Sequence, residues 1–333
     1  MPHDMNAMIY QQLTDRRQRL SAALPTSGDA GLHLSYLLQE VDAALERLDN
    51  GSYGLCDECH EPIETDRLLA DPLLCLCLDH LNPSQQRSLE EDLVLASRIQ
   101  KGLLPRQNLA QTGWQTSYLY RPAALVSGDY CDLVSGEDGA LYFVLGDVSG
   151  KGIAASMLMA HLHAMFRTLI PIQLPLHQLV GRASRVFCES TLPTHYATLV
   201  CGRAFLNGEI EICNAGHLPV LVVEGDEISQ VDATGLPVGL FCNQEFTVNR
   251  MRLREGGVML LYTDGVIEAR DARDNEYGLP RLLEWLQGHR NLSPADLLES
   301  LEKDLTEFRS GTPWADDLSI LAIQRIAPET QSR

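Results

Sequence analysis

The part of the chain after about residue 114 is a series of short runs rich in β-branched and aromatic residues, many joined by Gly, Asn or Asp turns. Helical patterns interrupt the runs only at about 153–170, 175–190, 280–289 and 295–309. Because the runs come in neighbouring pairs, the sequence predicts an α+β fold with antiparallel sheets and helices packed outside them. The predicted strands are YCDLV, ALYFVLGDV, YATLVCGRAF, EIEICNAG, PVLVVEG, GVMLLYTDGV and LSILAIQ.

The first third of the chain has a different pattern. Apolar residues at helical spacing predict helices over 5–22 and 32–49, and the link PTSGDAG between them favours an antiparallel hairpin. A cysteine-rich segment follows, and a further helical pattern runs over 84–104 until Pro105 closes it. A length of 333 residues agrees with more than one domain. The predicted boundaries are 1–52, 53–83, 84–106 and 107–328.

Charge and hydropathy limit the partners and the compartment. The 45 acidic residues exceed the 26 basic ones and give a net charge of −19, which would repel a nucleic-acid backbone. No run approaches 18 uninterrupted apolar residues, so we expect no membrane-spanning helix. The start of the chain lacks the pattern of a signal peptide. We therefore expect a cytoplasmic protein.

A cluster of cysteines indicates a metal site. Cys56 and Cys59 are separated by two residues, and after 17 further residues Cys77 and His80 repeat this spacing. Two such pairs are typical of a closed, tetrahedral, structural Zn²⁺ site. Cys75 is a spare thiol that could compete as a ligand, sense oxidants or be an ordinary half-buried residue. In a reducing compartment the other five cysteines are interpreted as small core residues.

The segment GSYGLCDECHEPIETDRLLADPLLCLCLDH, preceded by a helix ending ALERLDN, resembles the DksA/TraR-type zinc finger, with His80 in the place of a fourth cysteine. The resemblance implies a helical hairpin that can enter the secondary channel of RNA polymerase. The hairpin here spans only roughly 28 Å at 1.5 Å per residue. The alternative is a structural zinc knuckle that fastens a hairpin used for signalling or dimerisation.

Aspartates stand next to the ends of predicted strands at four places. Asp129 lies in SGDYCD, Asp147 in LYFVLGDVSGKG, Asp264 in LLYTDGV, and Asp316 with Asp317 in WADDLSI. Any one of them could be an ordinary turn residue. Together they can converge on one edge of a sheet, where hard oxygen ligands suit Mg²⁺ or Mn²⁺.

The segment GDVSGKG does not form a P-loop. Leu145 stands where the first glycine of that motif would be, and Gly152 follows the lysine where Ser or Thr would bind Mg²⁺. A nucleotide-hydrolysing function is therefore disfavoured.

The motif series resembles the SpoIIE/RsbU-type branch of the metal-dependent (PPM, 2C-like) protein serine/threonine phosphatases over roughly residues 88–326. The matching segments are SLEEDLVLASRIQKGLLP, SGDYCD, GDVSGKGIAASMLMA, YATLVCGRAF, NAGHLPVLVV, TGLPVGLF, LLYTDGVIEARD and ADDLSILAI. The resemblance implies an αββα sandwich of two antiparallel sheets, here preceded by the hairpin and zinc-finger module. In this branch the helix over 84–106 resembles a switch that controls assembly of the metal site.

The resemblance also implies residue roles. Two Mn²⁺ or Mg²⁺ ions would share a bridging hydroxide that attacks phosphorus in line with the leaving seryl or threonyl oxygen. Asp147 would bridge both ions and the Val148 carbonyl would bind one of them. Asp129, Asp264 and Asp316 would complete the second site and its waters. Asp316 aligns better than Asp317, which is the fallback.

Two positions depart from the eukaryotic members of the family. Ser149 stands where they have a histidine that is a candidate general acid, and the nearest upstream arginine, Arg121, lies eight residues before Asp129. Proton delivery to the leaving group could then come from metal-bound water. Lys151 is either a phosphate contact or a solvated turn residue.

Three histidines could be mistaken for functional groups. His217 in NAGHLP is predicted to make structural hydrogen bonds, with a catalytic base as the alternative. His161 and His163 are two residues apart on a helix, so they face different sides and are not expected to clamp a metal.

Two hypotheses follow. The first is a phosphatase that acts on phosphoserine or phosphothreonine of a regulatory protein, by resemblance an anti-sigma-factor antagonist, under the control of the zinc module. The alternative is a zinc-finger transcription regulator that binds RNA polymerase and carries a phosphatase-like sensor domain. In the first hypothesis the zinc hairpin forms a homodimer or docks a partner, and the linker helix transmits the signal.

Overall fold

The computed structural model describes residues 3–23, 31–81, 83–105, 110–111 and 113–327. The chain divides into two compact units, Met1–Asp92 and Leu93–Arg333. The division falls within helix α4 (Pro83–Leu103), which occupies the segment predicted as a linker helix.

The N-terminal unit is built on two helices, α1 (His3–Ala23) and α2 (Gly31–Asn50), as the helical patterns predict. They pack against each other through buried apolar side chains and are tied by an ion pair of 2.6 Å between Arg17 and Asp42. The cysteine-rich segment shares their core. It contains the short helices α3 (Thr65–Ala70) and η2 (Leu78–His80).

Two antiparallel sheets form the centre of the C-terminal unit. One sheet has the order β1-β2-β11-β10-β7-β8, and the other has the order β3-β4-β5-β6-β9. The strands of the first sheet are β1 (Ala110–Gln111), β2 (Trp114–Arg121), β11 (Leu318–Arg325), β10 (Val258–Tyr262), β7 (Val220–Glu224) and β8 (Glu227–Val231). Those of the second are β3 (Tyr130–Ser135), β4 (Leu141–Val148), β5 (Ala197–Ala204), β6 (Glu209–Ala215) and β9 (Asn249–Arg252).

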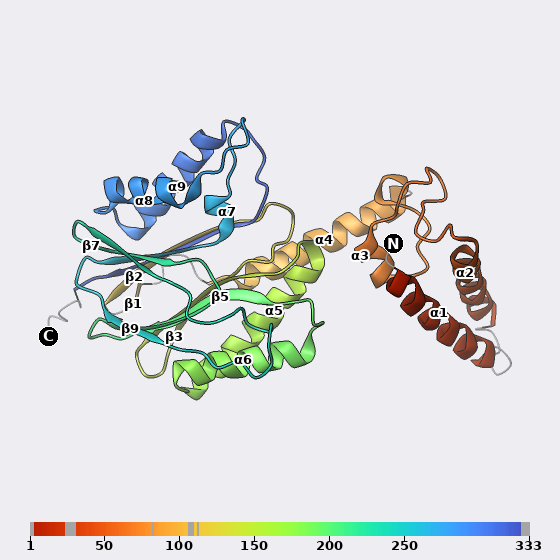
Figure 1. Cartoon of the computed structure of the whole chain (residues 1–333), viewed down its shortest axis with the longest axis horizontal. Helices are drawn as coiled ribbons and strands as arrows, with labels where there is room; N and C mark the ends of the chain where they lie inside the picture. The colour runs from red at the N-terminus through yellow and green to blue at the C-terminus, as the bar shows by residue number, and fades with distance from the viewer. Residues whose placement is uncertain (1–2, 24–30, 82, 106–109, 112, 328–333) are drawn as a thin grey trace. The chain divides into compact units, whose positions relative to one another are not determined.

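Helices cover the outer face of each sheet, which gives four layers (Figure 1). Helices α5 (Gly152–Leu169) and α6 (Leu176–Ser190), with the short η3 (Ile170–Ile172) between them, pack on the second sheet. Helices α7 (Asp264–Ile267), α8 (Gly278–His289) and α9 (Pro294–Arg309) pack on the first. A third apolar cluster, which includes Trp114, Phe143 and Met259, fills the space between the sheets.

The predicted sandwich of antiparallel sheets flanked by helices is confirmed. All seven predicted strands are present, and so are the four helices that were expected among them. Strands β1, β2, β8 and β9 were not predicted. Polar residues such as Gln115 and Ser117 interrupt the apolar pattern of β2, and its pairing with β11 is what defines it as a strand.

Among the described residues, one helix is long and apolar enough to cross a membrane by length and composition alone, with a mean hydropathy of 1.3 over Gly152–Ile172. The expectation of no such segment considered only uninterrupted apolar runs. Met159, Leu162 and Phe166 of this helix are buried against the second sheet. One face of this helix therefore belongs to the protein core.

The interpretation of the five scattered cysteines is correct for three and wrong for two. Cys131, Cys201 and Cys213 are buried thiols of the core. Cys188 and Cys242 form a disulfide between the end of α6 and the segment that joins β8 to β9. The two residues are 54 positions apart, so only the packing of α6 beside that segment brings them together.

Candidate functional site

Strand pairing brings Asp129 and Asp147 to the same end of the second sheet. Tyr130, the first residue of β3, pairs with Gly146 near the end of β4. In an antiparallel pair the start of one strand lies beside the end of the other, so the residues flanking this pair are neighbours. Gly128 lies so close to β4 that an added Cβ would be 3.0 Å from the Val148 carbonyl oxygen and 3.3 Å from Asp147 Oδ1.

The first sheet brings Asp264 and Asp316 together in the same way. Tyr262 at the end of β10 pairs with Ile320 near the start of β11. Asp264 begins α7 directly after β10. Gly265 permits a close approach of the two segments, because a Cβ there would lie only 2.0 Å from the Asp317 carbonyl oxygen.

A threonine joins the two halves of the site across the sandwich. The Thr263 hydroxyl donates to Asp129 Oδ2 at 3.0 Å and accepts from the Ser319 backbone N–H at 3.0 Å. All three groups are buried. The sequence analysis missed Thr263, although its position directly before Asp264 was a usable signal.

The charges of the four aspartates interact. Burial first, and the neighbouring charge of Asp147 second, raise the pKa of Asp129 well above its usual value. Burial, followed by the charges of Asp264 and Asp316, raises the pKa of Asp147 to about 7. Burial and Asp316 likewise raise the pKa of Asp264. These carboxylates thus lie near enough for their charges to interact and are partly or fully buried, and a bound divalent cation would relieve their repulsion. Among the described residues their oxygens do not form a group that lies within 4.8 Å of one another.

Asp316 and Asp317 differ in their contacts. Both oxygens of Asp317 accept backbone hydrogen bonds, one from the Ala123 N–H at 2.7 Å and the other from the Gly128 N–H at 3.0 Å. Asp317 therefore holds the segment that leads into Asp129. Asp316 accepts instead from Lys151 Nζ at 2.8 Å, and that ammonium also donates to the Ala315 carbonyl at 3.1 Å.

Lys151 is accordingly an ion-pair partner of Asp316 and not only a solvated turn residue.

Ser149 is bonded to Tyr196, because its N–H donates to the Tyr196 carbonyl at 2.9 Å and its hydroxyl accepts from the Tyr196 N–H at 3.0 Å. Arg121 pairs with Glu302 of α9 at 2.6 Å. The Arg121 guanidinium is therefore engaged outside the aspartate cluster.

A cavity of about 400 Å³ opens beside the aspartates. Asp147 and Asp264 line it, and an exposed carboxylate, Glu268, stands at its edge. Burial, followed by the charge of Asp264, raises the pKa of Glu268. The sequence analysis named neither Glu268 nor Tyr196 as part of the site. The remaining lining residues are Ser149, Tyr196, Thr198, Gly216, His217, Leu218, Pro219 and Ile267.

The histidines lie as the sequence analysis expected. His217 Nε2 faces the Tyr262 carbonyl at 3.1 Å, so Nε2 carries the proton and Nδ1 accepts from the Thr198 hydroxyl at 2.9 Å. Burial lowers the pKa of His217 to about 4, which keeps the ring neutral. His161 contacts Ser190, whereas His163 lies beside Asp132.

Helix α4 contacts the segment that carries Asp129. The buried Gln100 side chain donates to the Ser127 carbonyl at 2.6 Å and accepts from the Ser127 N–H at 3.0 Å. The Ser127 hydroxyl in turn accepts from the Asp129 N–H at 3.0 Å. A side chain of α4 thus reaches a metal-ligand candidate through one intervening residue.

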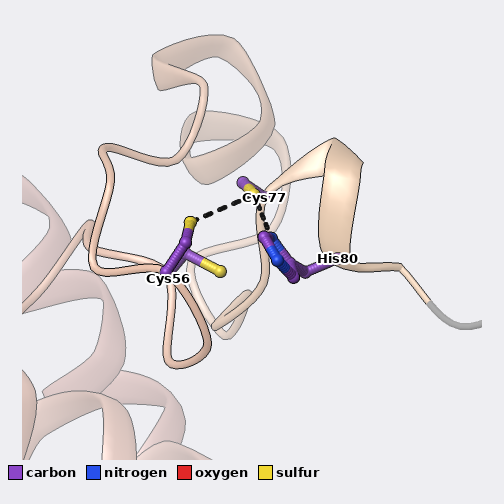
Figure 2. A group of neighbouring side chains, drawn as sticks. Cys56, Cys77 and His80 are labelled. Carbon is purple, nitrogen blue, oxygen red and sulfur yellow. Dashed lines mark hydrogen bonds between the residues drawn. The ribbon is translucent and has the colours of Figure 1, made fainter.

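The second candidate site lies in the N-terminal unit. Among the described residues, one group of His, Cys, Asp or Glu has its ligand atoms all within 4.8 Å of one another: Cys56, Cys59, Cys77 and His80. The side chains of Cys56, Cys77 and His80 point toward one another (Figure 2). The sulfurs of Cys59 and Cys77 are 3.8 Å apart, and Cys77 Sγ is 3.2 Å from His80 Nδ1.

The pKa of Cys56 and the pKa of Cys75, a nearby thiol outside the four-residue group, are shifted in opposite directions. Burial favours the neutral form of Cys56, but hydrogen bonds from backbone N–H groups and from Cys77 outweigh it and lower the pKa of Cys56 to about 6. Cys75 is half-buried near Arg47 and Asp57 and lies outside the four-residue group. Burial raises the pKa of the Cys75 thiol.

Solved structures of low sequence identity share this fold. The SiaA-PP2C domain of Pseudomonas aeruginosa aligns with a TM-score of 0.63 at 17% identity and covers 72% of this chain and 98% of that one. The RsbU and RsbW domains of Rv1364c from Mycobacterium tuberculosis align with a TM-score of 0.58 at 29% identity, covering 68% and 62%. The two sheets and their outer helices are therefore a PP2C-like phosphatase fold.

The family model of stage II sporulation protein E (SpoIIE) matches residues 137–326, and the chain belongs to this family. Protein IcfG of Synechocystis sp. is 27% identical over 263 residues, which are 70% of this chain and 41% of that protein. The phosphoserine phosphatase RsbP of Bacillus subtilis is 26% identical over 68% of this chain and 56% of its own length. The chain thus spans about half the length of these two relatives.

Proposed function

We propose that this protein is a metal-dependent phosphatase that hydrolyses phosphoserine or phosphothreonine of a regulatory protein. The observation that carries the proposal is the cluster of strand-end aspartates, contributed by both sheets, beside a cavity lined by Asp147 and Asp264. Membership of the SpoIIE family and the similarity to a phosphoserine phosphatase support this activity.

The donor set fits two Mg²⁺ or Mn²⁺ ions, since it consists of hard carboxylate oxygens whose charges repel one another. Asp129, Asp147, Asp264, Asp316 and the Val148 carbonyl would hold the ions. The contacts of Asp317 with two backbone N–H groups favour Asp316 over Asp317 as a ligand. When bound, the ions would activate water near neutral pH and offset negative charge on the phosphoryl group.

The chain's own residues position the reacting groups. Thr263 orients Asp129, and Asp317 holds the backbone that precedes it. The bonds between Ser149 and Tyr196 fix the turn after Asp147 against the start of β5, which forms one wall of the cavity. Neither Ser149 nor Arg121 supplies the acid or phosphate-binding role known from eukaryotic relatives, so the substrate phosphate would depend mainly on the aspartate–metal cluster.

The activity is tested with p-nitrophenyl phosphate and a phosphoserine peptide in the presence of Mn²⁺. We expect hydrolysis that EDTA abolishes and that Mn²⁺ or Mg²⁺ restores. Activity that persists in both EDTA and the Asp147→Ala variant would contradict the proposal. By resemblance to its branch, the physiological substrate is a phosphorylated anti-sigma-factor antagonist, and a metal-site variant used as a substrate trap would identify it.

We also propose that Cys56, Cys59, Cys77 and His80 bind one structural Zn²⁺. Thiolate sulfurs at about 2.3 Å from a tetrahedral zinc ion lie about 3.8 Å apart, and the sulfurs of Cys59 and Cys77 have this separation. The resemblance to the DksA/TraR zinc finger supports the assignment. The test is the zinc content of the purified chain, where one equivalent is expected and none would contradict the site.

The N-terminal unit is proposed to control the phosphatase through α4. The supporting contact is the pair of hydrogen bonds between Gln100 and Ser127, whose hydroxyl accepts from the Asp129 N–H. Replacing Gln100 by Ala should weaken Mn²⁺ binding, whereas the exposed neighbour Lys101→Ala should not.

Light scattering of the full chain and of a chain lacking residues 1–84 would test whether the unit also dimerises, and the turnover of the two chains would test the control. An unchanged oligomeric state would contradict dimerisation through this unit, and identical turnover would contradict this control.

A further inference from the structure

The disulfide between Cys188 and Cys242 is open to exchange with thiols. The Cα atoms are 5.3 Å apart, within the range of ordinary disulfides. Cys242 is exposed and Cys188 is half-buried, so a small thiol can reach the bond. By contrast, Cys201 and Cys213 pair directly across β5 and β6 and remain free thiols in the core. Accessibility therefore distinguishes the Cys188–Cys242 pair from the other cysteines of the C-terminal unit.

The bond anchors the segment between β8 and β9, residues 232–248, to α6. Leu240 and Phe241 of this segment are exposed, so little apolar packing holds its outer part. Apart from the disulfide, this segment is held by the buried ring of Phe246 and by a hydrogen bond of 2.8 Å from Gln244 to the Leu236 carbonyl. Two longer hydrogen bonds, of 3.3 and 3.4 Å, join Thr234 and Thr247 across its base. Reduction would remove the covalent bond that joins this segment to α6 and leave only the non-covalent contacts.

The inner part of the same segment supports the wall of the candidate active-site cavity. Val238 pairs with Ala197 through two backbone hydrogen bonds of 2.8 and 2.9 Å. Ala197 stands between Tyr196 and Thr198, which both line the cavity. Pro237 packs so closely on Gly216, another lining residue, that an added Cβ on this glycine would meet the Pro237 ring at 2.6 Å.

A further contact joins this inner part to α6. The Gly239 N–H donates to the Ser184 hydroxyl at 3.2 Å, and a Cβ at Gly239 would lie 2.4 Å from the Phe187 ring. Cys188 is the next residue of α6. Residues 237–242 thus connect the disulfide to the cavity wall. Cys242 carries the disulfide, Gly239 contacts α6, and Val238 and Pro237 contact the residues of the wall.

We propose that Cys188 and Cys242 are a reversible redox-modification site whose state sets the rigidity of the cavity wall formed by Tyr196, Thr198, Gly216 and His217. The oxidant is a low-molecular-weight disulfide of the glutathione class. The thiolate of one cysteine attacks glutathione disulfide, which forms a mixed disulfide and releases one glutathione. The second cysteine then displaces the other glutathione. The two thiol protons and two electrons of the protein end on two molecules of glutathione.

The experiment uses the full chain in buffers that span a wide range of reduced to oxidised glutathione. Free thiols are blocked and the 188–242 cross-link is quantified by peptide mass. The bond should form and break reversibly within this range, and the Cys188→Ser/Cys242→Ser variant should show no such cross-link. A cross-link that is absent at every ratio, or that glutathione never reduces, would overturn the proposal.

The effect on the wall is read by amide hydrogen exchange, which does not require activity. Peptides that contain residues 196–198 and 214–217 should exchange at least threefold faster after reduction of the native chain, with no response in the double variant. Equal exchange in both redox states would overturn the coupling. A response that persists in the double variant would come from other cysteines of the chain and would also overturn the proposal.

The consequence for catalysis rests on the proposed phosphatase function. The KM for a phosphoserine peptide should rise at least threefold on reduction, and Cys75→Ser should leave this response intact. An unchanged KM would refute the effect on the active site. Absence of turnover in both redox states would refute the phosphatase function alone, because cross-linking and exchange still decide the redox site.

Discussion

The two candidate metal sites of this protein are assembled in opposite ways. The four cysteine and histidine ligands of the N-terminal unit lie within 25 residues and come from adjoining turns. The aspartates of the C-terminal unit come from both sheets, and the hydrogen bond from Thr263 to Asp129 joins residues 134 positions apart. The first site can form as soon as one short segment folds, whereas the second exists only when the sandwich is complete.

This difference indicates a separate role for the metal at each site. A closed set of four soft ligands leaves no position for substrate, so zinc would contribute mainly to folding. The carboxylates stand at strand ends of both sheets and adjoin a cavity, so their ions would contribute mainly to chemistry. Loss of zinc should therefore unfold the N-terminal unit and alter turnover only by removing the control that this unit is proposed to exert, while loss of an aspartate should abolish turnover and spare the fold.

The largest expected effect is at the zinc site. Cys77→Ser should release the metal and unfold the unit Met1–Asp92, because structural zinc sites are worth about 10–16 kcal/mol in finger peptides. Zinc content and hydrogen exchange of peptides in α1 and α2 measure the result. Cys75→Ser is the matched control, two residues away, and should keep both zinc and protection. Retention of protected helices in Cys77→Ser would show that the apolar core alone stabilises this unit.

The next effect concerns the aspartate that both metal ions are proposed to share. Asp147→Ala should lower kcat/KM for a phosphoserine peptide by about 1,000-fold or more, which corresponds to roughly 4 kcal/mol. The melting temperature of the metal-free chain should not fall, since the substitution removes a crowded carboxylate. Asp232→Ala, at an exposed position outside the site, should change neither quantity. A comparable loss of turnover in the control would remove the argument for Asp147.

A smaller effect on metal binding is expected for Asp317, which holds the backbone before Asp129. In Asp317→Asn one of the two backbone N–H groups loses its acceptor, so the segment before Asp129 is held less firmly. Mn²⁺ affinity measured by calorimetry should fall by about 10–100-fold, as for other residues that orient metal ligands. Asp316→Asn should be more damaging. If the order of the two variants were reversed, Asp317 would be the ligand.

The smallest effect is a pH dependence of stability. His217 has a native pKa of about 4, below its ordinary value of about 6.5, so the unfolded chain binds more protons between these values. Its contribution to stability is complete above about pH 6.5 and is lost as pH falls toward 4. From pH 7.5 to 5.5 this amounts to about 1 kcal/mol.

Denaturant unfolding of wild type and His217→Gln at the two pH values measures this contribution. Glutamine can keep both hydrogen bonds without titrating, so the variant should lose about 1 kcal/mol less than wild type on acidification. An identical loss in the two proteins would mean that His217 does not titrate as its burial implies.

Much of the architecture was predictable from local patterns. Paired β-rich runs and intervening helical periods identified the sandwich, because alternation and helical spacing are properties of a few adjacent residues. The two pairs of metal ligands in the N-terminal unit were predictable for the same reason. Strand β2 was not, because its apolar pattern is weak and its pairing with β11 is a long-range property.

The sequence by itself determined the chemistry of the ligands: thiols and imidazole in one unit, carboxylates at strand ends in the other. Only the tertiary structure decided that Asp317 holds a backbone segment while Asp316 pairs with Lys151, and that two apparent core cysteines form a disulfide. These outcomes depend on which distant segments pack together. That choice is made by the burial of apolar surface across the whole sandwich rather than by neighbours along the chain.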